Sequence, residues 1–300
     1  MQSLSSRSIR ILDFDSSIYP SQKRLLAKYN HPPYSAKIVN LLSCGPAARA
    51  WIGKSNASKL AESLDPADKN KITLYGSGDF HHISALLIDQ FKEDFCVVVF
   101  DFHPDLDATF PKFSCGSWVN IITRKIEVKK IVVLGPSSED LDFPHNLTFN
   151  FSHLKDARVK IYPFYHKPSI TAFGRIVWEN LRDKDINRFM KELAENLPSK
   201  NVYLSIDKDC LMPDYAVTNW EPGVLGLDWL LDALEVLKSE ANIVGMDITG
   251  DYSPIVADSV IKKLCTKIDH PGQPEGRISL DEINRINEAT NLKILELFLG

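Results

Sequence analysis

The sequence has few cysteines, and their arrangement suggests neither a cross-linked scaffold nor a thiolate metal site. Its five cysteines are scattered over 300 residues, their number is odd, and none forms a Cys-x-x-Cys pair. Disulfide frameworks use even sets of cysteines, and thiolate zinc sites use closely paired ones. Both are therefore disfavoured, and the cysteine usage fits a reducing compartment, which predicts a cytoplasmic protein.

The sequence also lacks long apolar runs and clusters of positive charge. The first apolar run, residues 9–14, is interrupted by Asp13, and no run approaches the length of a membrane-spanning helix. The net charge is −4, and no segment holds enough lysine and arginine to act as a basic arm. We therefore expect neither a membrane nor a nucleic acid as a partner.

Seven short runs of β-branched and aromatic residues predict buried strands, and segments with helical periodicity lie between them. The apolar character of the runs is continuous rather than alternating, as in strands that are covered on both faces. This alternation predicts an α/β fold with a parallel sheet between helices. The strands are expected at residues 9–14, 72–75, 95–100, 131–134, 159–162, 202–206 and 243–248, and the helices at 57–64, 84–91, 186–197, 227–237 and 280–299.

Nothing along the chain marks a domain boundary. There is no internal repeat or low-complexity tract, and the proline- and glycine-rich stretch 270–276 is typical of a surface loop before the last helix. A hydrophobic content of 44% is enough to build one large core. We therefore predict a single domain over residues 1–300.

The most informative segment follows the predicted strand at 95–100 and reads Asp-Phe-His-Pro-Asp over residues 101–105. Side chains of an extended chain alternate between two faces, so Asp101, His103 and Asp105 are expected to point the same way. Ligand sites in such sheets lie beyond the carboxyl ends of the strands. Three metal-binding side-chain types at one strand end predict a metal site.

Two further strand ends carry side chains of the same types. One strand leads into Asp207 and Asp209, which are expected to share a face while Lys208 points away. Another leads through a glycine-rich turn to His81 and His82. Each motif alone is more typical of a polar loop or of a phosphate site, and the two histidines alone would suit a helix start that faces water. The combination at three strand ends is what indicates a metal centre.

Four aspartates that meet in a partly dry cleft repel one another unless protons or cations neutralise them. Two divalent cations would balance the four carboxylates. Oxygen and imidazole ligands without thiolate favour Mn²⁺ over Zn²⁺ or copper. Because a pair of ions can share one water, lower its pKa and direct hydroxide at an electrophilic carbon, the pattern predicts a hydrolase without a protein nucleophile.

These motifs resemble those of the ureohydrolase superfamily, which includes arginase, agmatinase and formimidoylglutamase. Residues 76–81, Gly-Ser-Gly-Asp-Phe-His, are similar to the family's Gly-Gly-Asp-His segment. Residues 101–105 match its Asp-Ala-His-x-Asp motif, and residues 205–209 match its Ser-x-Asp-x-Asp motif. Residues 245–248, Gly-Met-Asp-Ile, are similar to a late family strand that carries a substrate-binding acid.

The resemblance implies a three-layer α/β/α sandwich with a binuclear centre. The implied activity is hydrolysis of a linear, non-peptide C–N bond in a guanidino, amidino or related small-molecule substrate by a metal-bridging hydroxide. His82 competes with His81 as the first ligand, because this chain has one residue more than the family motif at that point. Oligomers are common in the family, so a homo-oligomer is a further expectation. The implied ligands are His81, Asp101, His103, Asp105, Asp207 and Asp209.

The chain departs from the family at three points. Cys115 stands near the place of a His-Gly pair that is proposed to shuttle protons, and a thiol does so only if its surroundings lower its pKa. Asp251 stands near the place of a substrate-contacting glutamate, where it would clamp a guanidinium group or be a solvated loop acid. Trp220 occupies a loop that is small in the family, either over a cationic substrate or packed against the core. Cys115 and Asp251 are therefore the candidate catalytic residues.

Two alternatives stay open. A mononuclear zinc amidohydrolase of the deacetylase type would use the His81–His82 pair with Asp101 and His103 around one ion. A catalytically silent family member would keep the metals for stability or ligand binding. The missing family histidine and glutamate motivate the second alternative.

Overall fold

The computed structural model describes residues 8–18, 22–109, 111–150, 152, 157–172, 174–270 and 278–300. The polar segment 1–7 lies outside these residues. So does the surface loop expected at 270–276, apart from His270.

The core of the fold is a sheet of eight strands, and every described strand pair in it is parallel. The order across the sheet is β2-β1-β3-β10-β9-β4-β5-β6. A separate antiparallel hairpin is formed by β7 (Ser169–Thr171) and β8 (Gly174–Ile176). The predicted parallel sheet is confirmed. Its strands are β1 (Ser8–Asp13), β2 (Ser35–Asn40), β3 (Ile72–Leu74), β4 (Phe95–Phe100), β5 (Val128–Gly135), β6 (Val159–Pro163), β9 (Asn201–Asp207) and β10 (Asn242–Thr249).

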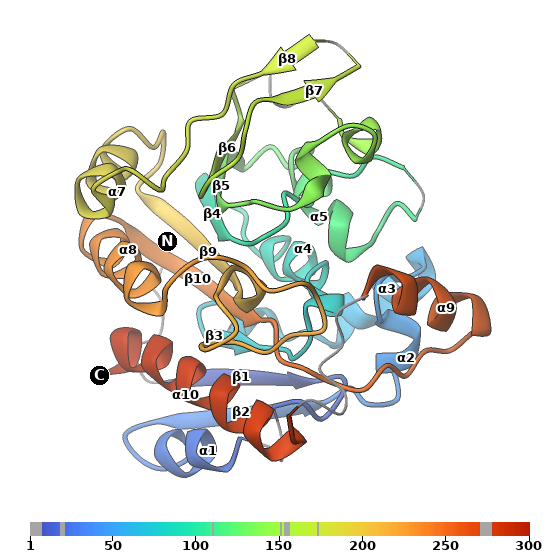
Figure 1. The fold of residues 1–300 in the computed structure, drawn as a ribbon. Helices are drawn as coiled ribbons and strands as arrows, with labels where there is room; N and C mark the ends of the chain where they lie inside the picture. Colours follow the sequence, from blue (N-terminus) through green and yellow to red (C-terminus); the bar gives the residue numbers. More distant parts are fainter. Residues whose placement is uncertain are drawn as a thin grey trace.

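Helices cover both faces of the sheet, which gives the predicted three layers (Figure 1). The first apolar core lies between the sheet and α1 (Lys23–Tyr29), α7 (Ile186–Glu195), α8 (Leu227–Glu240) and α10 (Leu280–Leu299). The second core lies on the opposite face, against α2 (Gly45–Ala48), α3 (Lys54–Ser63), α4 (Ile83–Ile88) and α5 (Trp118–Ile122). At the edge of the molecule, α9 (Val260–Asp269) lies beside α2 and α3 (Figure 1).

The local sequence explains where the helices begin. Ser279 caps α10, because its side chain accepts a hydrogen bond from the Glu282 backbone N–H at 3.2 Å. The Asp185 side chain caps α7 in the same way through the Arg188 N–H at 3.0 Å. Within the described residues, no helix combines the length and the apolar character that crossing a membrane requires.

The register of the four central strands brings their carboxyl ends to one place. Phe100 of β4 pairs with Ile206 of β9, Ile206 pairs with Ile248 of β10, and Ile248 pairs with Leu74 of β3. Parallel strands that end level with one another deliver the following residues to the same edge. The three motifs singled out in the sequence follow β3, β4 and β9, so the fold gathers them.

Candidate metal centre

The segment after β4 reaches the centre as a folded loop and not as a continued strand. The strand ends at Phe100, and residues 101–106 have no regular structure. Asp105 has a left-handed backbone with φ 51°, and the His103 N–H donates to Asp101 Oδ1 at 2.7 Å. The prediction that Asp101, His103 and Asp105 point the same way because they alternate along an extended strand is therefore wrong. The loop turns back on itself, and that fold brings the side chains together.

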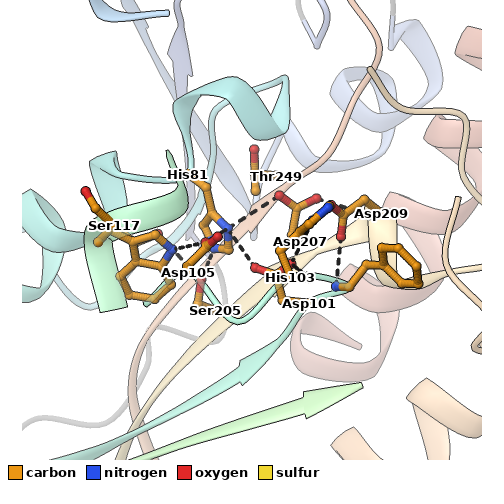
Figure 2. Close-up of polar contacts among 12 residues, drawn as sticks. His81, Asp101, His103, Asp105, Ser117, Ser205, Asp207, Asp209 and Thr249 are labelled. Atoms are coloured by element: carbon orange, nitrogen blue, oxygen red, sulfur yellow. Dashed lines mark hydrogen bonds and ion pairs between the residues drawn. The ribbon is translucent and has the colours of Figure 1, made fainter. Parts of the chain in front are cut away.

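His81 lies at the middle of a group of three carboxylates. Its Nδ1 is 3.1 Å from Asp101 Oδ2, 3.3 Å from Asp105 Oδ2 and 3.4 Å from Asp207 Oδ2. Figure 2 shows these side chains pointing toward one another from separate strand ends. All four residues are buried. The motif that contains His81 therefore lies against both aspartate motifs.

His103 lies in a second group that shares one member with the first. Its Nδ1 is 2.9 Å from Asp209 Oδ2 and 3.7 Å from Asp101 Oδ1 (Figure 2). Asp101 therefore presents one carboxylate oxygen to His81 and the other to His103. A carboxylate placed in this way can bridge two ions.

The donor set fits divalent ions. In each of two trios, one ligand atom from every residue lies within 4.8 Å of the others, and the trios are His81, Asp101, Asp105 and Asp101, His103, Asp209. Asp101 Oδ2 is buried but has no hydrogen-bond donor among the described residues. Because protein N and O ligands stand about 2.0–2.2 Å from such ions, trios of this span can enclose one. The fit is chemical as well, since the donors are oxygen and imidazole.

Burial and mutual repulsion raise the pKa values of three of the four carboxylates. Burial and the charge of Asp101 raise the pKa of Asp105 to about 7 and that of Asp209 to about 6. Burial and the charge of Asp209 raise the pKa of Asp207 well above its usual range. Burial would also raise the pKa of Asp101, but the nearby imidazoles of His103 and His81 lower it to about 2. Cations at this point would remove the repulsion.

Of the two neighbouring histidines, only His81 faces the carboxylates. The His82 ring packs edge-on against Phe113 with centroids 5.3 Å apart, and neither of its ring nitrogens has a hydrogen-bond partner among the described residues. Burial lowers the pKa of His82 to about 3. The structure therefore does not assemble the His–His pair that a deacetylase-type site would use.

A chain of hydrogen bonds orients His81 from behind. Its Nε2 lies 2.9 Å from Ser205 Oγ, and Ser205 Oγ donates to Asp247 Oδ1 at 2.7 Å. The hydroxyls of Tyr203 and Tyr75 also donate to Asp247, at 2.5 and 3.1 Å. Because Ser205 donates to Asp247, its oxygen is left to accept from His81 Nε2, an arrangement in which Nδ1 would be the metal-binding nitrogen.

Sequence reasoning missed three side chains that fix the candidate ligands. Trp118 Nε1 donates to Asp105 Oδ2 at 2.6 Å, and its ring packs 4.8 Å from that of His81. Glu221 Oε1 lies 3.6 Å from His103 Nε2. Ser205 appeared only as part of a family motif. Trp118 and Glu221 stand close in the sequence to Cys115 and Trp220, and that closeness was the signal available for them.

The centre forms the floor of a cavity of about 520 Å³. Three carboxylates beyond the candidate ligands line it, and the part of the chain that the structure describes contributes no lysine or arginine to the lining. Two tryptophans form part of the wall. Trp220 packs edge-on against His103 at 5.2 Å, so it contacts a candidate ligand and the cavity at once. The added acids are Asp107, Asp140 and Asp269.

Cys115 lies in the wall of this cavity, at the start of a short 3-10 helix, η3 (Cys115–Ser117). Burial, together with the charges of Asp79 and Asp105, raises the pKa of its thiol well above the usual range. Proton transfer by Cys115 requires surroundings that lower the thiol pKa. The surroundings act in the opposite direction, so the thiol is protonated at neutral pH.

Asp251 is not among the residues that line the cavity. It is 1% exposed, and Lys208 Nζ and Gln22 Nε2 donate to its Oδ1 at 2.8 and 2.7 Å. It is therefore neither a solvated loop acid nor open to a substrate cation. Its place in the fold differs from both possibilities that the sequence suggested, because Lys208, the residue immediately after β9, is already paired with it.

Comparisons with known proteins agree with this geometry. A sequence profile of the arginase family matches residues 54–260, a range that holds all six candidate ligands. An uncharacterized protein of Thermotoga maritima is 29% identical over 248 residues, which make up 82% of this chain and 81% of that protein.

Two solved structures show the same fold over nearly the whole chain. Arginase from Bacillus subtilis aligns with a TM-score of 0.59 and 17% identity, covering 98% of this chain and 99% of its own. Formimidoylglutamase from Bacillus subtilis aligns with a TM-score of 0.59 and 14% identity, covering 99% and 88%. At such identities the superpositions establish architecture alone.

Proposed function

The chain belongs to the arginase family, and on that premise we propose that it is a metal-dependent hydrolase of a linear, non-peptide C–N bond. The substrate would be a guanidino, amidino or related small molecule. The observation that carries this proposal is the sharing of Asp101 between two histidine–carboxylate groups on the floor of one cavity.

The residues on the cavity floor would hold two divalent ions, with Mn²⁺ favoured by the donor types. The first would lie among His81, Asp101, Asp105 and Asp207, and the second among Asp101, His103 and Asp209. When bound, such a pair lowers the pKa of a water and polarises the scissile bond.

The chain's own residues fix the ligands in place. Ser205 and Asp247 hold His81 so that Nδ1 faces the carboxylates, and Trp118 holds Asp105 through its indole N–H. Partners of this kind keep ligands aligned and commonly change metal affinity when removed. The site therefore has the support that a working centre needs.

The charge of the cavity supports a cationic substrate. Asp107, Asp140 and Asp269 line it beyond the ligands, and no lysine or arginine among the described residues lines it to receive a carboxylate. A low-dielectric cavity lined by one sign of charge concentrates ligands of the opposite sign. Compounds that carry a guanidinium or amidinium group without an acid group would therefore enter more readily than arginine or formimidoylglutamate.

A panel assay tests this function. Manganese-loaded protein should release urea, ammonia or an amine from at least one guanidino or amidino compound, with agmatine-like cations ahead of arginine. Asp101→Asn should reduce that activity to background, while Asp89→Asn on the surface should keep it. An activity that survives both metal removal and Asp101→Asn would contradict the proposal.

A catalytically silent metal-binding protein is the second candidate, and two observations favour it. The Cys115 thiol is protonated where the family has a proton-shuttling histidine, and the Asp251 carboxylate is enclosed by Lys208. This candidate predicts full metal binding but no product from any compound in the panel. Turnover by the metal-loaded protein would exclude it.

A further inference from the structure

A buried ion pair lies directly behind the candidate metal centre. Lys208 stands between Asp207 and Asp209 in the sequence, and its Nζ donates to Asp251 Oδ1 at 2.8 Å. The Lys208 side chain is 0% exposed and that of Asp251 is 2% exposed. Lysine is rarely enclosed in this way, because its ammonium loses its hydration and must be paired. The burial of Lys208 between two candidate ligands therefore depends on its pairing with Asp251.

Two amide side chains anchor Asp251 from other directions. Gln22 Nε2 donates to Asp251 Oδ1 at 2.7 Å, and Asn291 Nδ2 lies 3.4 Å from both oxygens. Asn291 Nδ2 also donates to Gln22 Oε1 at 2.9 Å. Gln22 immediately precedes α1 and Asn291 belongs to α10, so the carboxylate is held by the helical layer. The Asp251 carboxylate is thus held in place independently of Lys208, and the Lys208 ammonium binds to it.

The backbone around Lys208 is packed closely. Gly250 has φ +88°, and a Cβ on it would lie 2.5 Å from Asp207 Oδ1 and 2.6 Å from the Lys208 backbone N. The Asp251 N–H donates to the Gly76 carbonyl at 2.9 Å. The end of β10 thus rests against the peptide between Asp207 and Lys208.

The turn at Lys208 determines which oxygen of Asp207 and which oxygen of Asp209 face the candidate ligand histidines. Asp207 Oδ1 accepts from the Asp209 N–H at 3.1 Å, which leaves Oδ2 facing His81. Asp209 Oδ1 accepts from the Phe102 N–H at 3.1 Å, which leaves Oδ2 on His103. A rotation of this turn would spoil both arrangements together.

We propose that Lys208 and Asp251 are positioning residues for the metal centre. Their ion pair draws the Lys208 side chain into the helical layer and so fixes the rotation of residues 207–209, with one oxygen of Asp207 and one of Asp209 aimed at the ions. This inference rests on the proposed function, which assigns Asp207 and Asp209 as ligands. Lys208 reaches Asp251 directly, so the pair acts on the ligands through the backbone and does not touch the substrate.

Calorimetric titration of Mn²⁺ into metal-stripped, full-length protein tests the proposal. Lys208→Met and Asp251→Asn should each weaken manganese binding by about 10- to 100-fold relative to the wild type, the range seen when support of metal ligands is lost. The double variant leaves no buried charge unpaired, so it should fold even where a single variant does not. It should still bind manganese more weakly, because the ion pair no longer holds the rotation of the turn.

Glu288→Gln is the matched control. Glu288 pairs with Arg24 and also joins α1 to α10, but it does not contact the 207–209 turn. Its substitution should lower the melting temperature and leave manganese affinity unchanged. Wild-type affinity in the folded double variant, or equal weakening in the control, would overturn the positioning role alone. A wild-type protein that binds no manganese would overturn the proposed function and this inference with it.

Discussion

Asp101 is the residue on which the two halves of the candidate centre depend. It faces His81 with one oxygen and His103 with the other, and its Oδ2 is buried without a hydrogen-bond donor among the described residues. A buried carboxylate oxygen that lacks a donor is costly in a folded protein unless a cation completes its surroundings. A cation on each side of Asp101 would therefore complete the surroundings of its carboxylate.

The support of His81 gives a first prediction. Ser205→Ala removes the partner of His81 Nε2 and one donor to Asp247. We expect manganese affinity to fall by about 10- to 100-fold with little change in the fold, measured by calorimetric titration and circular dichroism. Ser199→Ala, just before the same strand, should bind as the wild type does. Equal affinities in both variants would contradict the assigned role of Ser205.

The two adjacent histidines give a second prediction. His81→Ala should abolish binding of at least one ion, because His81 is the only imidazole among the described residues that faces three of the carboxylates. His82→Leu exchanges a buried ring, which has no hydrogen-bond partner in the described part of the chain, for an apolar side chain of similar size. It should change the free energy of unfolding by less than about 1.5 kcal/mol and leave the metal count unchanged. Loss of metal in His82→Leu would reverse the assignment.

At the scale of elements, the apolar runs gave a good prediction of the central strands. β4 and most of β9 are buried along their whole length, so continuous hydrophobicity marks them clearly. β2 was missed because it is an edge strand whose side chains are mostly exposed or half-buried, which removes the apolar signal. α9 was missed as well, although its apolar residues recur at helical spacing; in the structure Val260, Ile261, Leu264 and Ile268 are exposed.

The candidate site was predictable for a different reason. Ligand-type side chains follow three strand ends, and the strand order places those ends together whatever the loop conformations are. The loop of residues 101–106 and the Lys208–Asp251 pair were beyond reach, because both depend on contacts between residues far apart in the chain. Residue type and spacing show which groups exist, and tertiary packing decides which way they point.

The close approach of β10 to the end of β9 gives a third prediction. Gly250→Ala would add a Cβ 2.5 Å from Asp207 Oδ1 at a backbone with φ +88°. The strain should lower the free energy of unfolding by about 1–3 kcal/mol and weaken manganese binding, as urea unfolding and metal titration would show. Gly53→Ala, where a Cβ meets nothing within 4 Å, should be nearly neutral. Similar effects of the two substitutions would argue against the proposed packing.

At the scale of the whole molecule, the clustered carboxylates make stability depend on pH in the metal-free protein. The folded-state pKa is about 7 for Asp105 and about 6 for Asp209, both above the ordinary 3.8. A group with a raised pKa stabilises the fold at low pH, and this contribution is lost as the pH rises through the folded-state value. The metal-free melting temperature should therefore fall between about pH 4, near the unfolded-state pKa, and about pH 7, the higher of the two folded-state values.

Manganese should flatten that profile, because bound cations stabilise the ionised carboxylates, and affinity should rise over the same pH range. Thermal scans with chelator and with excess manganese measure both trends. The double variant Asp105→Asn with Asp209→Asn should show a shallower slope without metal. A metal-free melting temperature that rises with pH would contradict the assigned pKa directions.

The central claim is that two ions share Asp101, and the number of manganese ions bound per chain tests it most directly. Elemental analysis of purified, manganese-saturated protein at neutral pH should find two ions in the wild type, one in Asp209→Asn and none held tightly in Asp101→Asn. A wild type that binds no divalent ion in excess manganese, or an Asp101→Asn variant that still binds two, would contradict it.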